Sequence, residues 1–230
     1  MNQARLARVL RNMERDGLTQ IVISSTASVY YLTGYWVEPM ERMLALYIRA
    51  DGTCRLFANA LFALEPQEGL ELVLHQDSDA PTAALSAALL PGTLGVDKAW
   101  PSKFLIALLA ARPDVTPVLG SAPVDDARKY KDADEIAAMR RASQINDQVV
   151  EAAIRGAERG MKEYPRIRVG LILCCMRGDT NQELNMQTVE TAKKYLGSVV
   201  CAVDIAGAEG LFPTEMFAPV FAKVREYGLP

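Results

Sequence analysis

Apolar and polar residues follow helical and extended patterns in alternation along the whole chain, which is typical of an α/β fold. Residues 2–16 repeat apolar side chains every three to four positions and stop at Gly17, which predicts a helix, and the apolar run 20–24 predicts a strand. The sequence Asp51-Gly52 predicts a hairpin turn. Further strands are expected at 43–49, 54–58, 70–74, 93–96 and 116–119, and helices at 25–33, 82–90 and 102–111.

The pattern changes at about residue 132. Residues 132–162 contain no proline and repeat apolar side chains from Ile136 to Ala153, which predicts one helix of roughly 45 Å at 1.5 Å per residue. A strand at 168–175, a helix at 182–196, a strand at 198–205 and a helix at 214–227 are expected after it. These four elements predict a βαβα unit with two parallel strands.

Composition narrows the function classes. The 230 residues carry 25 Lys and Arg against 28 Asp and Glu, a net charge of −3, so there is no general excess of positive charge for nucleic acid. No apolar run approaches the roughly 20 residues of a membrane helix, and residues 1–11 precede no apolar leader segment. We therefore expect a cytoplasmic protein with neither a nucleic-acid nor a membrane partner.

Several residues could carry chemistry, each with a structural alternative. His75 is the single histidine and precedes Asp77 and Asp79, but a lone imidazole is a weak metal or base site, and we interpret it as a solvated loop residue. Asp125-Asp126 could form a paired-carboxylate site, or complement the N-terminus of the helix that begins near residue 132. We favour the helix interpretation.

The four cysteines, at 54, 174, 175 and 201, lack zinc-ribbon spacing. Adjacent Cys174 and Cys175 would point to opposite faces of a strand. With Cys201 they could form a reactive cluster if the two strands are neighbours. No Lys or His is nearby to lower a thiol pKa, so we interpret them as reduced core residues.

Gly207 and Glu209 are the candidate ligand-binding residues. They follow the predicted strand 198–205, and ligands of parallel α/β units bind at the carboxyl ends of strands. Arg177-Gly178-Asp179 matches an adhesion tripeptide, although Gly178 is explained more simply as a turn residue.

Residues 1–150 resemble the N-terminal domain of the Xaa-Pro peptidase and creatinase family. The resemblance rests on Tyr31-Leu32-Thr33-Gly34, on Glu41-Arg42, and on residues 124–142, which include Arg128 and Lys131. It implies that residues 124–142 form the linker and first helix leading into a catalytic domain. The two-metal site of that domain, with two Asp, one His and two Glu, has no counterpart after residue 150.

Residues from about 150 to 230 resemble part of the adenosine deaminase family. Residues 168–178 are similar to its fourth barrel strand, 188–196 to the following helix, and 203–209 to its fifth strand, which implies that Gly207 faces a purine. The first-strand His-x-His is missing, and the chain stops at Pro230, before the next zinc ligand and the general acid/base Glu would follow. Residues 149–162 fit both families.

We therefore expect three parts: a three-layer domain with a mixed sheet at 1–131, a bridging helix at 132–162, and a deaminase-like βαβα fragment at 163–230. The favoured hypothesis is an engineered, non-catalytic chimera with no catalytic residue, metal, cofactor or small-molecule ligand. A metal-dependent hydrolase with residual activity and a small-molecule binder with a pocket at the junction are the alternatives. We expect a homodimer that covers the apolar strand residues, with docking onto the N-terminal sheet as the competing outcome; these residues are Val169, Leu171, Leu173, Val199, Val200 and Val203.

Overall fold

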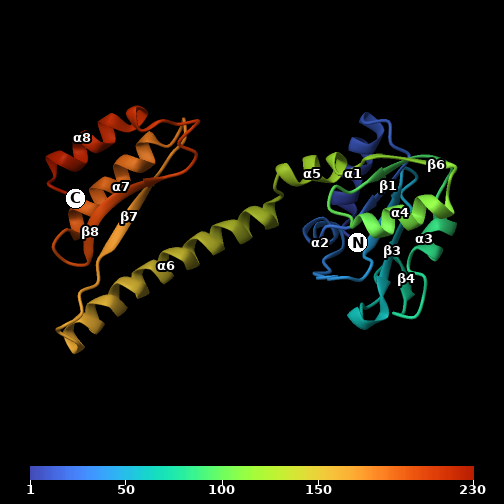
Figure 1. Ribbon diagram of the computed structural model, residues 1–230, viewed down its shortest axis with the longest axis horizontal. Coiled ribbons are helices and arrows are strands. Elements are labelled where there is room, and N and C mark those ends of the chain that lie inside the picture. Colours follow the sequence, from blue (N-terminus) through green and yellow to red (C-terminus); the bar gives the residue numbers. More distant parts are fainter. The chain divides into compact units, whose positions relative to one another are not determined.

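The computed structural model describes residues 1–230 and divides them into two compact units, Met1–Asp132 and Ala133–Pro230 (Figure 1). Helices and strands alternate in both, so the predicted α/β class is confirmed. None of the helices combines the length and the apolar character that crossing a bilayer requires.

The first unit is built on a six-stranded mixed sheet with the order β4-β3-β2-β1-β5-β6. Strand β2 is antiparallel to both β1 and β3, whereas β1–β5, β3–β4 and β5–β6 are parallel pairs. The predicted hairpin is therefore confirmed, and Gly52 closes its turn with a φ of 88°. The strands are β1 (Gln20–Ile23), β2 (Ala45–Arg49), β3 (Cys54–Asn59), β4 (Glu71–His75), β5 (Gly92–Val96) and β6 (Val115–Leu119).

Helices cover both faces of this sheet, which confirms the predicted three-layer arrangement. One core lies on the side of α1 (Gln3–Arg15), α2 (Thr26–Thr33) and α5 (Ala122–Lys129), and the other on the side of α3 (Thr82–Ala88) and α4 (Ser102–Ala111). Side chains of the central strand alternate between them: Ile21 and Ile23 enter the first core, and Val22 enters the second. A short 3-10 helix, η1 (Ala60–Phe62), follows β3.

Helix α5 was not predicted from the sequence. A proline, Pro123, stands in its first turn together with Asp125, and Arg128 and Lys129 stand in its last turn. Proline at the start and charges that oppose the helix dipole are the signals of a helix. Its eight residues are too few to show a hydrophobic period clearly.

The second unit begins with α6 (Ala133–Glu163), an uninterrupted helix of 31 residues, as predicted. It continues with β7 (Leu171–Met176), α7 (Gln182–Tyr195), β8 (Val200–Ala206), the 3-10 helix η2 (Thr214–Phe217) and α8 (Ala218–Glu226). Strands β7 and β8 are parallel, so the predicted βαβα unit is confirmed.

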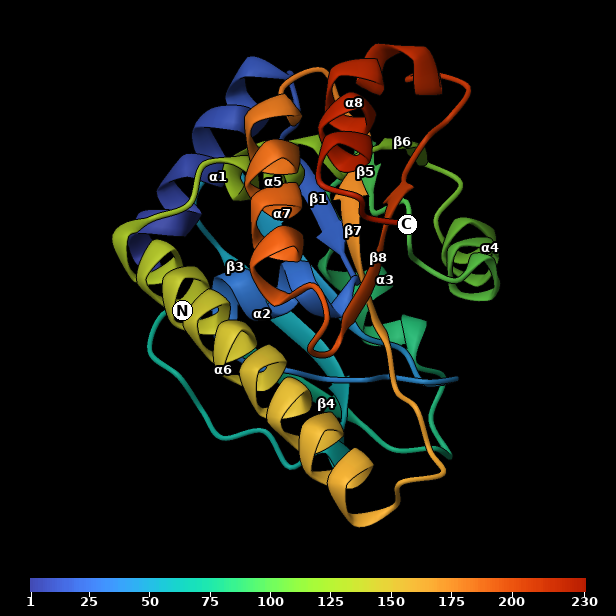
Figure 2. The ribbon, with the colours of Figure 1, turned by 90° about the vertical axis from the view of Figure 1, so that its left-hand side faces the viewer.

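Helices α7 and α8 lie side by side on the β7–β8 pair (Figure 2) and enclose a small core with Cys175, Val189 and Val220. The sequence predicted that Val199 and Val200 would need a partner to cover them. That prediction is wrong, because both are buried within this unit. Ile172 and Met176, at alternate positions of β7, are exposed instead.

Candidate functional site

The carboxyl ends of β7 and β8 meet at one edge of the second unit because the strands are parallel. Arg177 follows β7 directly and Gly207 follows β8 directly. Gly207 has a φ of 127°, and a Cβ added to it would lie 2.8 Å from the Cβ of Arg177. Only glycine fits this backbone conformation and this close approach. The structure thus places Gly207 and Glu209 at the predicted edge, packed against Arg177.

Arg177 organises this edge. Its Nη1 donates to the carbonyl of Phe212 at 2.7 Å, and its Nη2 donates to Oε1 of Glu209 and Oγ1 of Thr214, both at 3.0 Å. The Thr214 hydroxyl also donates to Glu209 Oε1 at 3.0 Å. The Arg177 side chain is only 6% exposed, whereas that of Glu209 is 71% exposed. The network holds the loop after β8 against the end of β7. Because the Arg177 side chain is buried in this network, it is not accessible to a partner that would recognise the tripeptide Arg177-Gly178-Asp179.

A buried amide completes the end of β7. Asn185 on α7 accepts from the Met176 N–H through Oδ1 at 2.8 Å and donates from Nδ2 to the Met176 carbonyl at 2.9 Å. The side chain pairs with the strand backbone as a neighbouring strand would. Sequence reasoning missed Asn185 and the role of Arg177. Asn185 pairs with backbone groups, and the partners of Arg177 lie more than 30 residues away in the chain, so no local motif reveals either.

His75 lines a cavity in the first unit. It is the last residue of β4 and half-buried, so its interpretation as a solvated loop residue is wrong. With Asp77, Asp79 and Lys103 it lines a cavity of about 270 Å³. Burial lowers the pKa of His75, and the carboxylates of Asp79 and Asp77 offset part of that effect. The imidazole therefore favours its neutral form.

The carboxylate of Asp77 in this cavity is already engaged. Arg42 donates to it through Nε at 2.8 Å and through Nη2 at 2.7 Å, and Asn59 donates at 2.8 Å. These contacts fasten the exposed loop that contains Trp36 and Met40 to the strand ends. Nowhere in residues 1–230 do three His, Cys, Asp or Glu side chains gather as a metal site.

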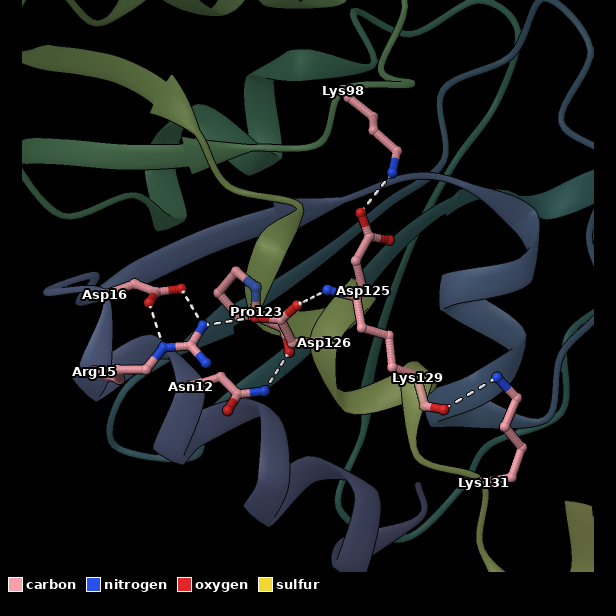
Figure 3. Close-up of polar contacts among 9 residues, drawn as sticks. All are labelled: Asn12, Arg15, Asp16, Lys98, Pro123, Asp125, Asp126, Lys129 and Lys131. Atoms are coloured by element: carbon pink, nitrogen blue, oxygen red, sulfur yellow. Dashed lines mark hydrogen bonds and ion pairs between the residues drawn. The ribbon is translucent and has the colours of Figure 1, made fainter. Parts of the chain in front are cut away.

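Asp125 and Asp126 belong to α5, so their predicted role at the start of the following helix is wrong. Asp125 pairs with Lys98 at 2.5 Å, and Asp126 pairs with Arg15 at 2.9 Å and Lys129 at 2.6 Å (Figure 3). Lys129, and then Arg15, lower the pKa of Asp126 through these hydrogen bonds. Each carboxylate has its own cation, so the two do not form an acid/base pair.

The cysteines are only partly core residues. Cys54 and Cys175 are buried, and burial raises the pKa of each thiol to about 11. Cys174 and Cys201 are exposed, which contradicts the core interpretation for these two. The opposite orientation of Cys174 and Cys175 is confirmed, and helices cover only the face that Cys175 occupies.

Two family models match the chain, one in each unit. The model described as Creatinase/Prolidase N-terminal domain matches residues 5–130, and the model described as Adenosine deaminase matches residues 133–230. The matches meet at the loop between α5 and α6. Both resemblances inferred from sequence motifs are confirmed.

Individual relatives include an adenosine deaminase and uncharacterized peptidases. An adenosine deaminase from Haemophilus ducreyi is 37% identical over 127 residues, covering 50% of this chain and 37% of that protein. An uncharacterized peptidase from Staphylococcus aureus is 26% identical over 167 residues, covering 69% of this chain and 46% of that protein. This chain spans less than half the length of each.

A solved structure supports the fold of the peptidase-like part. A recombinant prolidase from Thermococcus sibiricus has a TM-score of 0.62 to this chain at 24% identity, covering 69% of this chain and 45% of that one. At this identity the similarity concerns the fold alone.

Proposed function

The chain belongs to the creatinase/prolidase N-terminal domain family through residues 5–130, and on this premise we propose that it is a non-catalytic, engineered fusion with a structural role. Its first unit supplies the three-layer domain of that family, and its second unit supplies a deaminase-like βαβα fragment. Neither unit performs the hydrolytic chemistry of its parent family in this proposal.

The Arg177 network carries the proposal. The carboxyl edge of β7 and β8 is where a ligand of a parallel α/β unit would bind. Here the loop after β8 is held against that edge by Arg177, which donates to Phe212, Glu209 and Thr214. Glu209 is engaged in holding the loop rather than oriented toward a substrate. In this proposal Arg177, Glu209 and Thr214 are engaged with one another at this edge.

The histidine content also supports the proposal that the chain is not catalytic. Catalytic zinc sites use three protein ligands, usually including histidine. The single histidine of these 230 residues, His75, ends β4 in the first unit, and its neighbour Asp77 is held by Arg42 and Asn59.

The position of the junction supports an engineered origin. The peptidase match covers 69% of the chain and the deaminase match covers 50%, so the two must overlap over at least about a fifth of it. Helix α6 begins directly after the point where the two family models meet, and residues 149–162 within it fit both sequence patterns. A helix common to both parents can be joined without changing its backbone.

Metal content tests the proposal. We expect only substoichiometric zinc or manganese after the chain is dialysed against either ion and then against buffer, with the same result for His75→Gln. A full equivalent of metal that is lost in His75→Gln would support the alternative, a metal-dependent hydrolase with residual activity.

The proposal extends to a homodimer in a reducing compartment, the cytoplasm. Ile172 and Met176 of β7 are 59% and 52% exposed, and burying such side chains contributes about 1.5–3 kcal/mol each. Two-fold pairing is the commonest way to cover such a surface.

The free, exposed thiols of Cys174 and Cys201 support a compartment that keeps cysteines reduced.

A further inference from the structure

A groove of about 490 Å³ lies beside α1 and α5 in the first unit. Its position depends on α5, the helix that sequence patterns did not predict. Asn12 on α1 donates to the carbonyl of Pro123 on α5 at 2.8 Å, and apolar residues of both helices belong to one core. The groove is therefore formed by two helices that are fixed to each other.

Positive charge dominates the lining of this groove. Five of its side chains are cationic, namely Arg8, Arg11, Arg15, Lys129 and Lys131, against one carboxylate, Asp126. The whole chain has a net charge of −3, so this concentration of cations is local. A cationic concave surface raises the local concentration of anions.

Two of the five cations are neutralised by the protein itself (Figure 3). Arg15 pairs with Asp16 at 2.6 Å and with Asp126 at 2.9 Å, and Lys129 pairs with Asp126 at 2.6 Å. The hydrogen bond to Asp16, and then that to Asp126, raise the pKa of Arg15. These pairs fix the wall of the groove.

The other three cations have no carboxylate partner. Arg8 donates to the carbonyl of Tyr130 at 3.2 Å, and Lys131 donates to the carbonyl of Lys129 at 3.2 Å. Arg11 is exposed, and its side chain makes no hydrogen bond or ion pair among residues 1–230. Uncompensated charge therefore remains on α1, at Arg8 and Arg11, and on the segment after α5, at Lys131.

We propose that the groove between α1 and α5 binds a small anion with two or more linked phosphate groups. A guanidinium presents N–H donors in a fork that matches two phosphate oxygens, and a lysine supplies a compact positive charge. Several separate cations suit an anion with charge at both ends better than a single carboxylate. The volume falls within the roughly 300–1,000 Å³ of small-molecule sites. This departs from the sequence-based expectation of no small-molecule ligand.

Titration calorimetry of the full chain with inorganic pyrophosphate tests the site. We expect saturable binding with one site per chain that weakens as salt is added, because salt screens exposed charges. Arg11→Gln and Lys131→Gln should each weaken binding roughly tenfold, the scale of one lost charge-assisted contact. Both residues are exposed, so a thermal melt of each variant should match that of the parent.

Lys103→Gln is the matched control. Lys103, like Lys131, donates to a backbone carbonyl, that of Glu41, and it lies on α4, on the opposite side of the sheet. The affinity of the Lys103→Gln variant for pyrophosphate should equal that of the unsubstituted chain. Absence of saturable heat with the parent chain would overturn the proposal, as would a loss in Lys103→Gln as large as that in Lys131→Gln.

Discussion

At the scale of single residues, backbone groups are held by a few buried polar side chains that no sequence motif identifies. Gly207 and Glu209 could be placed at the end of a strand from the sequence, because a strand's end follows from its apolar run. Arg177 could not be assigned its role, since its partner Phe212 is contacted through a carbonyl 35 residues away in the chain. Asp97 is a second such residue.

We expect Arg177→Met to destabilise the second unit. The substitution leaves the Phe212 carbonyl without its donor and releases the loop that carries Glu209. An unsatisfied buried acceptor costs about 1–3 kcal/mol, and the Phe212 carbonyl is partly buried, so the free energy of unfolding measured in urea should fall by an amount near the lower end of that range. Arg168→Met, which changes an exposed arginine, is the control and should have little effect. Equal stabilities of the two variants would contradict the assigned role.

Asp97 should make the first unit sensitive to acid. Burial alone raises the pKa of this carboxyl, but hydrogen bonds from the backbone N–H groups of Ser24, Ser25 and Ala99 and from the Ser121 hydroxyl outweigh it, and the net pKa is lowered. A carboxyl with a lowered folded-state pKa stabilises the protein above its unfolded pKa of about 3.9. That stabilisation is lost as the pH falls through the folded pKa.

Asp97→Asn tests this linkage. Hydrogen bonds to a charged group contribute about 1.5–3 kcal/mol, so we expect a loss of that order at pH 7 and a smaller dependence of stability on pH below 4. Chemical unfolding at a series of pH values measures both. Asp179→Asn, at an exposed position, is the control, and its stability should depend on pH as that of the unsubstituted chain does. An Asp97→Asn curve parallel to that of the parent would rule out the linkage.

At the scale of elements, hydrophobic periodicity predicted long helices and hairpins well and short helices poorly. The 31-residue α6 repeats its apolar positions many times, whereas the eight-residue α5 contains about two turns. The cysteines show a related limit of hydrophobic and polar patterns, which do not tell which face of a strand is covered. Alternation predicted that Cys174 and Cys175 face opposite sides, but which side is covered depends on where α7 and α8 pack.

Gly156→Ala should stabilise α6. No atom lies within 4 Å of a Cβ added to Gly156, so alanine gains its helix propensity of about 1 kcal/mol without a clash. Gly120→Ala should have the opposite effect, since its Cβ would lie 2.4 Å from the carbonyl carbon of Gly95. Thermal unfolding of both variants measures the difference. A lower stability of Gly156→Ala would show that α6 is closely packed at this position.

At the scale of the whole molecule, the chain combines parts that match two families in sequence, one in each unit. Both resemblances were found from local motifs, because the strands and helices that carry them are continuous in sequence. The groove beside α1 and α5 was not found, since Arg8, Arg11 and Lys131 come together only when α5 packs on α1.

We expect the chain to self-associate. The mass of one chain is 25.2 kDa, and light scattering at micromolar concentration should give twice that value. Ile172→Lys should shift the mass toward the monomer, because a charge cannot be buried at a two-fold contact without a partner. A mass of one chain that does not change on dilution would exclude the dimer.

The absence of parental hydrolase activity is the central claim, and a turnover assay tests it most directly. The purified chain is incubated with zinc or manganese and, separately, with an Xaa-Pro dipeptide and with adenosine. Metal-assisted hydrolysis needs a held and activated water, and Arg177 and Glu209 hold a loop instead. We expect no product above a mock preparation. Turnover of either substrate that a chelator abolishes and that the mock preparation lacks would contradict the claim.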